Sequence, residues 1–309
     1  MRTRDHEDVA PLVNLADIAE IELVILKRMR EMASGDHRSR AQGAGFDFQG
    51  LRDWQPGDKF SSIDWAQSSL NNFSPLVIRE FEQPSVATVM PVADLSASTR
   101  CGIGGVPIAA AIARAVATIG MSAVFFQDPF GLMTFDGEFA HIGAMRPRLG
   151  KSHVVHCLDA YQHGRGLQHV RRSGSISTSL GGFLRRPSLL PIVSDFLFPD
   201  VGDVLDELVL LAATHDVFLV LVDSAFAFDL PPIPAGWVDV MDVERGTTRT
   251  VSRRQYRRLG DRARDWQATV QREARLRDLD CVVMGLDQAR SDIALGEFVV
   301  ERRLRKTHA

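Results

Sequence analysis

The chain of 309 residues has few of the features that mark a secreted, zinc-binding or membrane-spanning protein. Its 3 cysteines are odd in number and far apart. Their positions indicate neither a disulfide framework nor a zinc site, and we interpret Cys101, Cys157 and Cys281 as core thiols. No window approaches about 18 consecutive apolar residues, so we expect no membrane span. The charged first residues lack a long apolar run, so we expect no secretory signal and predict a cytoplasmic location.

An excess of charge of either sign is also missing. The formal net charge is -3, charged residues make up 24% and hydrophobic residues 45% of the chain, as in soluble globular proteins. Binding to phosphate backbones needs net or clustered positive charge, so we do not expect nucleic acid as the partner. The length allows one large or two modest domains with a sizeable core.

The motifs of several enzyme classes are absent or incomplete. Residues 149–152 read LGKS, like the end of a phosphate-binding loop, but Met145 replaces the first glycine and Pro147 interrupts the segment. A Gly-x-Ser-x-Gly elbow is missing. His153 and His156 are three residues apart with no acidic or third ligand evident, so we interpret them as a solvated helix face.

Apolar runs alternate with helical segments from Val86 onward. This alternation predicts a doubly wound, Rossmann-like α/β fold with a mostly parallel sheet covered on both faces. The predicted strands are 86–93, 122–127, 131–135, 189–193, 217–222 and 281–284. The predicted helices are 103–119, 154–161, 180–184, 201–213, 253–278 and 289–304, and a Gly/Ser/Arg-rich loop is expected at 163–177.

The segment before Val86 has a different pattern. Apolar residues at helical spacing predict a helix over residues 15–32. An irregular, polar segment with short strands at 46–48 and 76–81 follows. We therefore expect an N-terminal segment, 1–85, and an α/β domain, 86–305. A β-hairpin inserted at about 237–251 is expected within that domain.

Three oxygen-bearing side chains follow the first apolar strand. Asp94, Ser96 and Ser98 are two residues apart, so in an extended segment they point the same way. One carboxylate and two hydroxyls are ligands that suit Mg²⁺ or Mn²⁺. The alternative interpretation is a turn, because Asp and Ser also favour turns through local hydrogen bonds.

Two further side chains extend this oxygen array. Asp195 directly follows the apolar strand at 189–193, and Thr178 precedes a predicted helix. Asp94, Asp195 and Asp223 all follow strands, so they should project toward one edge of the sheet, where ligands bind in such folds. The alternatives are that Asp195 caps a helix and that Thr178 is a helix N-cap.

Taken together, Asp94, Ser96, Ser98, Thr178 and Asp195 resemble the metal-ion-dependent adhesion site of von Willebrand factor type A domains. The N-terminal segment is similar to the signature of one bacterial group, the domain-of-unknown-function family number fifty-eight. Its members carry a type A domain and are often encoded beside a MoxR-type AAA+ ATPase. The matching stretches are SGDHRS at 34–39, GAGFDF at 43–48, LRDWQPGD at 51–58 and IDW at 63–65.

The resemblance implies a non-catalytic protein-interaction module. Asp94, Ser96 and Ser98 would hold Mg²⁺ or Mn²⁺, and Thr178 and Asp195 would bind directly or through water. A partner's Asp or Glu would fill the open coordination position. The implied partners are a MoxR-type ATPase, for which the chain would act as an adaptor, or a client protein in the assembly of complexes.

The N-terminal signature offers a second docking surface. Its candidate residues are Arg52, Asp58, Asp64 and Trp65. The structural alternative is that the aromatic residues pack against the sheet and the charged ones form ion pairs. The sequence departs from the family here, where Ser61, Ser62, Ala66 and Ser69 stand at positions that are usually basic.

Two other functions use the same oxygens. A metal-dependent hydrolase or phosphoesterase would need a general base, and the sequence shows none near the triplet. A binding module with a vestigial metal site would have the same sequence but bind no ion.

Overall fold

The computed structural model describes residues 11–36, 47–55, 63–82, 87–103, 106–136, 139, 141–171, 175–184, 186–198, 200–228, 236–242, 247–285 and 288–305. The chain divides into two compact units. One consists of Met1–Leu26 and Ala87–Leu304, and the other of Lys27–Val86 and Arg305–Ala309.

The larger unit is an α/β structure around one mixed sheet. The strand order is β14-β11-β10-β3-β7-β8-β9, and β4 pairs with both β10 and β7. Six strands of the sheet pair parallel with one another: β3, β4, β7, β10, β11 and β14. Strand β8 pairs antiparallel with β7 and with β9. The bounds are β3 (Thr88–Val89), β4 (Val92–Asp94), β7 (Phe130–Phe135), β8 (Ile142–Arg148), β9 (Gln168–Val170), β10 (Ser188–Ser194), β11 (Asp216–Val222) and β14 (Cys281–Met284).

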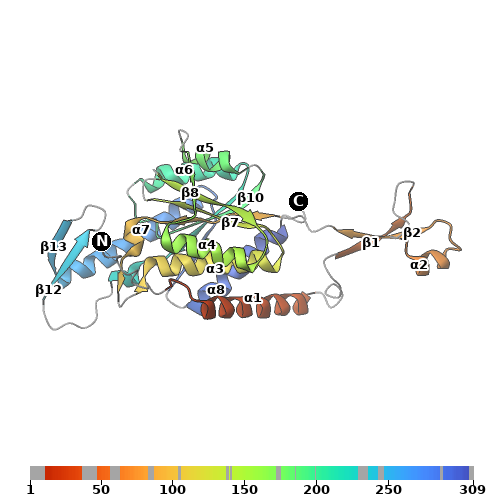
Figure 1. Cartoon of the computed structure of the whole chain (residues 1–309), viewed down its shortest axis with the longest axis horizontal. Helices are drawn as coiled ribbons and strands as arrows, with labels where there is room; N and C mark the ends of the chain where they lie inside the picture. Colours follow the sequence, from red (N-terminus) through yellow and green to blue (C-terminus); the bar gives the residue numbers. More distant parts are fainter. Residues whose placement is uncertain are drawn as a thin grey trace, which may run out of the picture. The chain divides into compact units, whose positions relative to one another are not determined.

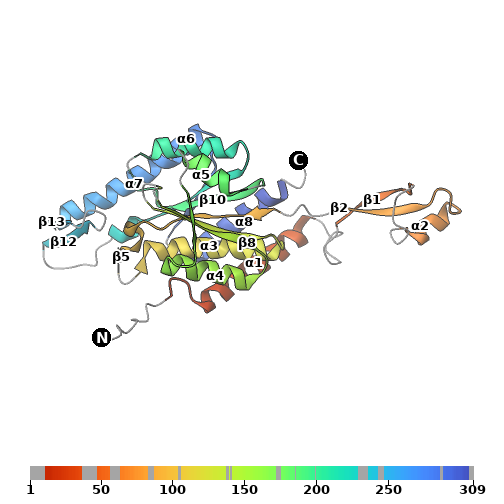
Figure 2. The ribbon, with the colours of Figure 1, turned by 45° about the horizontal axis from the view of Figure 1, so that its top comes forward.

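Helices cover both faces of this sheet, as Figures 1 and 2 show. Helices α5 (Ile176–Phe183), α6 (Val201–Ala212) and α7 (Arg253–Leu276) lie on one face. Helices α3 (Ile108–Phe125), α4 (Lys151–His163) and α8 (Gln288–Arg305) lie on the other. Side chains along β11 alternate accordingly, since Leu219 joins the core with α6 and α7 while Phe218 lies 5.0 Å from Phe298 of α8, ring centre to ring centre.

Two hairpins branch from this unit. Strands β12 (Trp237–Asp242) and β13 (Thr247–Ser252) pair antiparallel, where the inserted hairpin was predicted. A shorter pair, β5 (Gly102–Ile103) and β6 (Val106–Pro107), precedes α3.

The structure corrects part of the predicted element order. The predicted strand at 122–127 is wrong, because helix α3 continues to Phe125 and the chain then turns at Gln127, where φ is 56°. Strands β8 and β9 were not predicted. Gly143 and Pro147 interrupt the apolar pattern of β8, and β9 has only 3 residues inside the predicted loop.

Helix α3 is the apolar helix of the core. By length and composition it could cross a membrane, with a mean hydropathy of 1.8, although polar residues leave no unbroken apolar run. In the structure 78% of it is buried. Buried core helices of soluble proteins can have the same length and composition, so these two properties are weak support for a membrane span.

A buried ion pair joins α3 to α8. Arg114 donates to the Asp292 carboxylate from Nη2 at 2.6 Å and from Nε at 2.8 Å, and Thr118 Oγ1 donates to the other oxygen at 3.0 Å. Asp292 is 1% exposed. The pair is therefore shielded from water, and either charge alone would be costly to bury.

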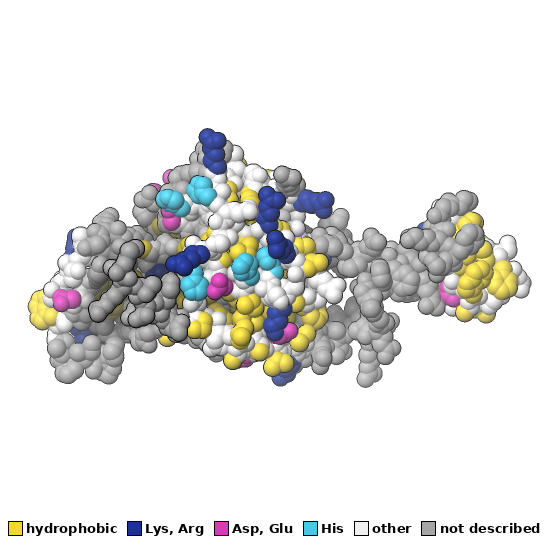
Figure 3. Space-filling view, in the orientation of Figure 1, with side chains coloured by type: hydrophobic (Ala, Val, Ile, Leu, Met, Phe, Trp, Pro, Cys, Tyr) yellow, Lys and Arg dark blue, Asp and Glu magenta, His cyan; other side chains and the backbone are white. Residues whose placement is uncertain are grey.

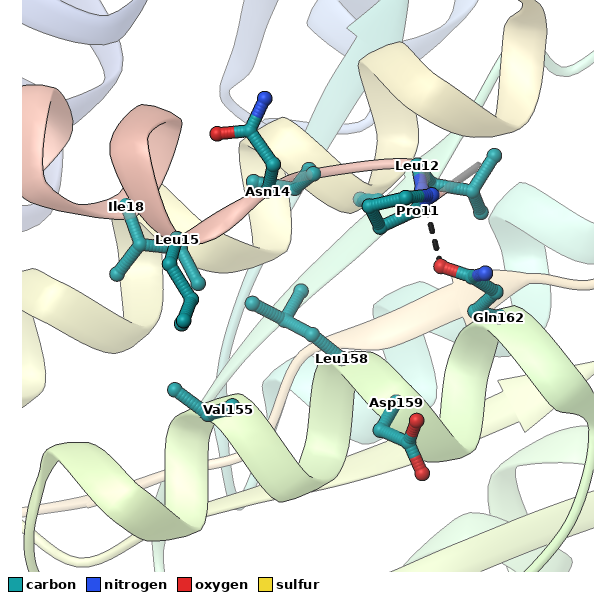
Figure 4. Close-up of a pocket in the computed structure, with 11 residues that line it drawn as sticks. Pro11, Leu12, Asn14, Leu15, Ile18, Val155, Leu158, Asp159 and Gln162 are labelled. Atoms are coloured by element: carbon teal, nitrogen blue, oxygen red, sulfur yellow. Dashed lines mark hydrogen bonds between the residues drawn. The ribbon is translucent and has the colours of Figure 1, made fainter. Parts of the chain in front are cut away.

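The start of helix α1 (Leu15–Asp36) packs on the larger unit. Ile18, Ile21 and Ile25 are buried, and the Leu12 amide donates to Gln162 Oε1 at 2.9 Å. This segment and α4 line a hollow of about 490 Å³, and Figure 4 shows the residues that surround it. Residues up to Leu26 therefore group with the α/β unit, whereas the predicted boundary at residue 85 placed the whole helix with the N-terminal segment.

The smaller unit is built on an antiparallel pair, β1 (Asp47–Asp53) and β2 (Val77–Glu82), with α2 (Trp65–Leu70) between them. Short strands were predicted at 46–48 and 76–81. Strand β1 runs further than predicted, to Asp53, with a register shift between Phe48 and Gly50.

We predict that Asp292→Ala destabilises the protein by about 3–5 kcal/mol, because it leaves the buried Arg114 with only the exposed Glu20, at 3.9 Å, as an acidic partner. Urea unfolding monitored by circular dichroism measures this free energy. The matched control is Arg264→Ala, which breaks an exposed pair with Asp261 and should cost less than about 1 kcal/mol. Equal effects of the two changes would contradict the prediction.

Candidate metal site

The candidate site lies where two neighbouring parallel strands end. In the register of β4 and β10, Val92 faces Ile192 and Ala93 faces Val193. The next residues along are Asp94 and Ser194, and Asp195 directly follows the end of β10. The carboxyl ends of parallel strands meet at one edge of a sheet, so the two carboxylates reach the same place from segments far apart in sequence.

The Asp94 carboxylate is fixed from both sides. Its Oδ1 accepts a hydrogen bond from the Ser96 amide at 2.8 Å, and its Oδ2 accepts one from Ser194 Oγ at 2.6 Å. Tyr161 of α4 donates to the Asp94 backbone carbonyl at 2.7 Å. Asp94 is only 1% exposed, so this anion is held inside the protein by a set of donors.

The two serine hydroxyls of the predicted triplet come together in the following loop. Ser96 Oγ and Ser98 Oγ are 3.1 Å apart. Thr99 Oγ1 donates to the Ser96 carbonyl at 2.7 Å and holds the turn that begins the short 3-10 helix Ala97–Arg100. Asp94, Ser96 and Ser98 are therefore near one another, although the loop between them is a turn rather than an extended strand.

Asp195 is the second carboxylate at this edge, and it is 4% exposed. Burial, and next the negative charge of Asp94, raise its pKa to about 7, while hydrogen bonds from Leu197 and Ser224 act in the opposite direction. A divalent cation here would favour the ionised form of both carboxylates. The donor set therefore fits such an ion.

A tight turn follows Asp195. Phe196 is fully buried and has a positive φ of 54°, which is unusual for a bulky residue. The Phe196 amide donates to Ser194 Oγ at 2.9 Å, and Trp266 Nε1 donates to the Phe196 carbonyl at 2.8 Å. Such strained residues are common at functional sites, because surrounding contacts must hold them in place.

Ser194 and Gln267 are site residues that sequence reasoning missed. Gln267 Nε2 donates to the Val222 carbonyl at 2.9 Å, and it lies 3.3 Å from both the Asp195 carbonyl and Ser224 Oγ. A signal for Gln267 was present, since it interrupts the buried stripe of α7 formed by Ala263, Val270 and Ala274. For Ser194 the signal was its place at the end of a buried strand.

Thr178 is in a different environment from the other predicted ligands. It is exposed in the first turn of α5, where its amide donates to Ser175 Oγ at 3.1 Å and its hydroxyl lies 2.9 Å from the same atom. The N-cap of α5 is Ser175, so the capping role considered for Thr178 belongs to the residue three positions before it. Asp223 caps its own turn by accepting from the Ala225 amide at 2.9 Å.

The docking residues predicted in the smaller unit have separate roles. Asp64 is buried and caps α2 by accepting from the Ala66 and Gln67 amides, so it is a structural residue. Trp65 is 57% exposed and thus available for contact, rather than packed as in the structural alternative. Arg52 Nη1 donates to the Asp53 carbonyl at 3.2 Å. Asp58 lies outside the described residues.

The oxygen set is the candidate that remains for a hard metal ion. Within the described part of the chain, no three His, Cys, Asp or Glu side chains gather as a metal site. An ion at this edge would depend on Asp94, Asp195 and the serine hydroxyls. Few carboxylates and several hydroxyl or water ligands are typical of Mg²⁺ sites.

Comparison with known proteins identifies one family. The family described as "Protein of unknown function DUF58" matches residues 50–274. A search of curated proteins found no match.

Two solved structures show a remote likeness. An aerotolerance-related membrane protein from Bacteroides fragilis NCTC 9343, with multiple mutations to serines, is 13% identical with a TM-score of 0.41 and covers 70% of this chain and 99% of its own. The conserved hypothetical protein BatB from Bacteroides thetaiotaomicron is 12% identical with a TM-score of 0.40, covering 72% and 98%. These TM-scores are too low to establish a shared fold.

We predict that the protein without metal loses stability between about pH 4 and pH 7 because of Asp195. Its unfolded form loses the proton near pH 3.8, whereas the folded form holds it until about pH 7. Rising pH therefore favours unfolding, by an amount of about 4 kcal/mol. Urea unfolding in EDTA at pH 5 and pH 8 measures about 3 kcal/mol of this difference, because the unfolded form has already lost the proton at pH 5.

Asp195→Asn should be more stable than the natural protein at pH 8 and should lack this pH dependence. Asp223→Asn is the matched control, because Asp223 follows the neighbouring strand β11. A pH dependence that is unchanged in Asp195→Asn would show that Asp195 ionises normally.

Proposed function

Because the chain belongs to the DUF58 family, whose function is unknown, we propose that it is a divalent-metal-dependent protein-interaction module with a von Willebrand factor type A-like fold. The observation that carries this proposal is the pair of buried carboxylates, Asp94 and Asp195, at the carboxyl edge of a parallel sheet. Two serine hydroxyls beside them complete a set of hard oxygen donors.

In the proposed mechanism Asp94 would hold Mg²⁺ or Mn²⁺ with Ser96 and Ser98. Such an ion would supply an electrophilic position for a partner's Asp or Glu. Ser194 and Tyr161 orient Asp94, because they bond its carboxylate and its carbonyl. Asp195 and Thr178 would contribute directly or through water.

The low charge of this ligand set favours recognition of an acidic partner. In this scheme Asp94 is the one direct carboxylate ligand when Asp195 acts through water. An ion held in this way would keep positive charge, which would attract a carboxylate from outside. We propose a MoxR-type AAA+ ATPase or its client as that partner, with the chain acting as a cytoplasmic adaptor.

The exposed side of α2 is the proposed second contact. Trp65 and Leu70 are 57% and 75% exposed, and large apolar side chains in the open are typical of interaction surfaces. Figure 3 shows hydrophobic side chains gathered on this end of the smaller unit. Arg52 could extend the contact to acidic groups.

One observation favours a metal-dependent hydrolase or phosphoesterase as the second candidate. Burial and the charge of Asp94 raise the pKa of Asp195 to about 7 in the protein without metal, so Asp195 would serve as a general base if the ion were held by Asp94 and the serines alone. The sequence suggested no base near the triplet, so this candidate gains support from the structure. Mg²⁺-dependent turnover in a phosphatase and esterase screen, lost in Asp195→Asn, would establish it.

We predict that tagged protein captures its partner in Mg²⁺ but not in EDTA, and that Asp94→Ala captures none in either. The reason is that the partner's carboxylate reaches the chain only through the ion. Affinity purification from the host, followed by mass spectrometry, measures the recovery of an AAA+ ATPase or client.

Asp223→Ala is the matched control and should behave as the natural protein, because its carboxylate caps a local turn. Equal recovery from the natural protein in Mg²⁺, the natural protein in EDTA and Asp94→Ala would overturn the proposal and point to α2 and Trp65 instead. Calorimetry that shows no binding of Mg²⁺ or Mn²⁺ would identify the site as vestigial.

A further inference from the structure

Three soft metal-ligating side chains meet between β8 and α4. Their sulfur and nitrogen donors differ from the hard oxygen donors of the Asp94 site. Met145 comes from β8, and His153 and Cys157 lie four residues apart on α4. Cys157 Sγ is 3.4 Å from Met145 Sδ and 3.6 Å from His153 Nε2. All three residues are buried, and Cys157 is completely inaccessible.

These separations are close to those of ligands on one ion. Bonds of about 2.3 Å to sulfur and about 2.0 Å to nitrogen, in a trigonal arrangement, place two sulfur donors about 4.0 Å apart and a sulfur and a nitrogen donor about 3.7 Å apart. To reach this geometry Cys157 Sγ and Met145 Sδ need to separate by about 0.6 Å, and Cys157 Sγ and His153 Nε2 by about 0.1 Å. Residues four apart on a helix point to the same side, which keeps His153 and Cys157 aligned.

We propose that Met145, His153 and Cys157 form a site for a Cu(I) ion. A thiolate, a thioether and an imidazole are the soft ligands that Cu(I) prefers. Charge supports the same ion, because Cu(I) and one thiolate are neutral together. A Zn²⁺ ion with the same ligands would leave a net positive charge in a buried place, which is costly.

The protonation states of the ligands suit this chemistry. Burial, together with the nearby Arg148 and His156, lowers the pKa of His153, so that its ring is neutral near pH 7, although its bond to the Arg146 carbonyl acts in the opposite direction. A neutral imidazole is the form that binds metals. Burial raises the pKa of the Cys157 thiol to about 12, so the thiol is inert until an ion replaces its proton. Binding thus joins Cu(I) to the sulfur and releases one proton to water.

The His153 ring has to change one hydrogen bond. Its Nε2 lies 3.0 Å from the Arg146 carbonyl, to which it donates in the protein without metal. Coordination through Nε2 moves the proton to Nδ1 and gives up this bond. The change costs some of the binding free energy, so removal of His153 should reduce the affinity less than removal of Cys157.

The surface beside the site offers a route of entry. His156 is exposed, and its ring centre is 6.3 Å from that of His153. Figure 3 shows histidine side chains over the face where α4 lies. An ion could therefore bind first to His156 and then pass inward to His153.

The sequence analysis named Cys157 as a core thiol but did not bring it together with His153 or Met145. His153 and His156 were noted for their spacing and assigned to a solvated helix face, and for His153 that prediction is wrong. The buried side of α4 includes Val154, Cys157 and Tyr161, and His153 lies on it. The missing ligand was Met145, from a strand that was not predicted.

The test is an anaerobic titration of the reduced, full-length protein with Cu(I) in competition with bicinchoninate. We expect one tight Cu(I) per chain, and X-ray absorption should show two sulfur ligands and one nitrogen ligand. Cys157→Ser should lower the affinity at least about 100-fold. Met145→Leu and His153→Gln should each lower it at least about tenfold. Leucine keeps the volume of Met145, and glutamine keeps the donor to the Arg146 carbonyl.

The chain carries its own matched controls, because Cys101 and Cys281 are also free thiols. The variant Cys101→Ser/Cys281→Ser should bind as the natural protein does. The proposal would be overturned by the loss of Cu(I) in that double variant, by unchanged binding in Cys157→Ser, or by no binding in competition. Melting temperatures of the variants without metal separate a loss of ligand from a loss of fold.

Discussion

The charge on Asp94 is the constraint on which the carboxyl edge of the sheet depends. Its carboxylate is held by Ser96 of its own loop and by Ser194 of β10, and its carbonyl is held by Tyr161 of α4. Three elements of the fold therefore converge on one anion. The same charge acts on Asp195, and with burial it raises the pKa of that carboxyl to about 7. A ligand that compensates the charge of Asp94 would therefore lower the pKa of Asp195 as well.

The parts of the fold that were predictable from sequence are those with one uniform pattern. Strand β11, with the sequence DVFLVLV, is an unbroken apolar run, and α6 has apolar residues at helical spacing. The prediction failed where the pattern changes inside an element. The end of α3 resembled a strand, since Val124 and Phe125 favour strands locally, but the helix continues because its apolar face is buried. Strand β8 carries Gly, Arg and Pro, which hide its alternation.

The candidate site also contains some residues that were predictable from the sequence and others that were not. Asp94 and Asp195 were predictable, because each follows an apolar strand and parallel strands end at one edge. The positions of Ser194, Gln267 and Thr178 were not, since they depend on which side chain meets which across elements. Sequence spacing gives the side of a strand or helix, but it does not give the neighbour on the next element. The same limit hid the contact of Met145 with Cys157, which lies between a strand and a helix.

The distance along the chain between Asp94 and Ser194 also has a consequence for synthesis. The two residues are 100 positions apart. At ribosomal rates of about 5–20 residues per second, Asp94 leaves the ribosome roughly 5–20 s before its partner. During that interval the aspartate is a solvated side chain on an unfinished chain, with neither its serine donor nor the neighbouring carboxylate. A partner that recognises this edge of the sheet would therefore ignore nascent chains and select molecules whose sheet is already assembled.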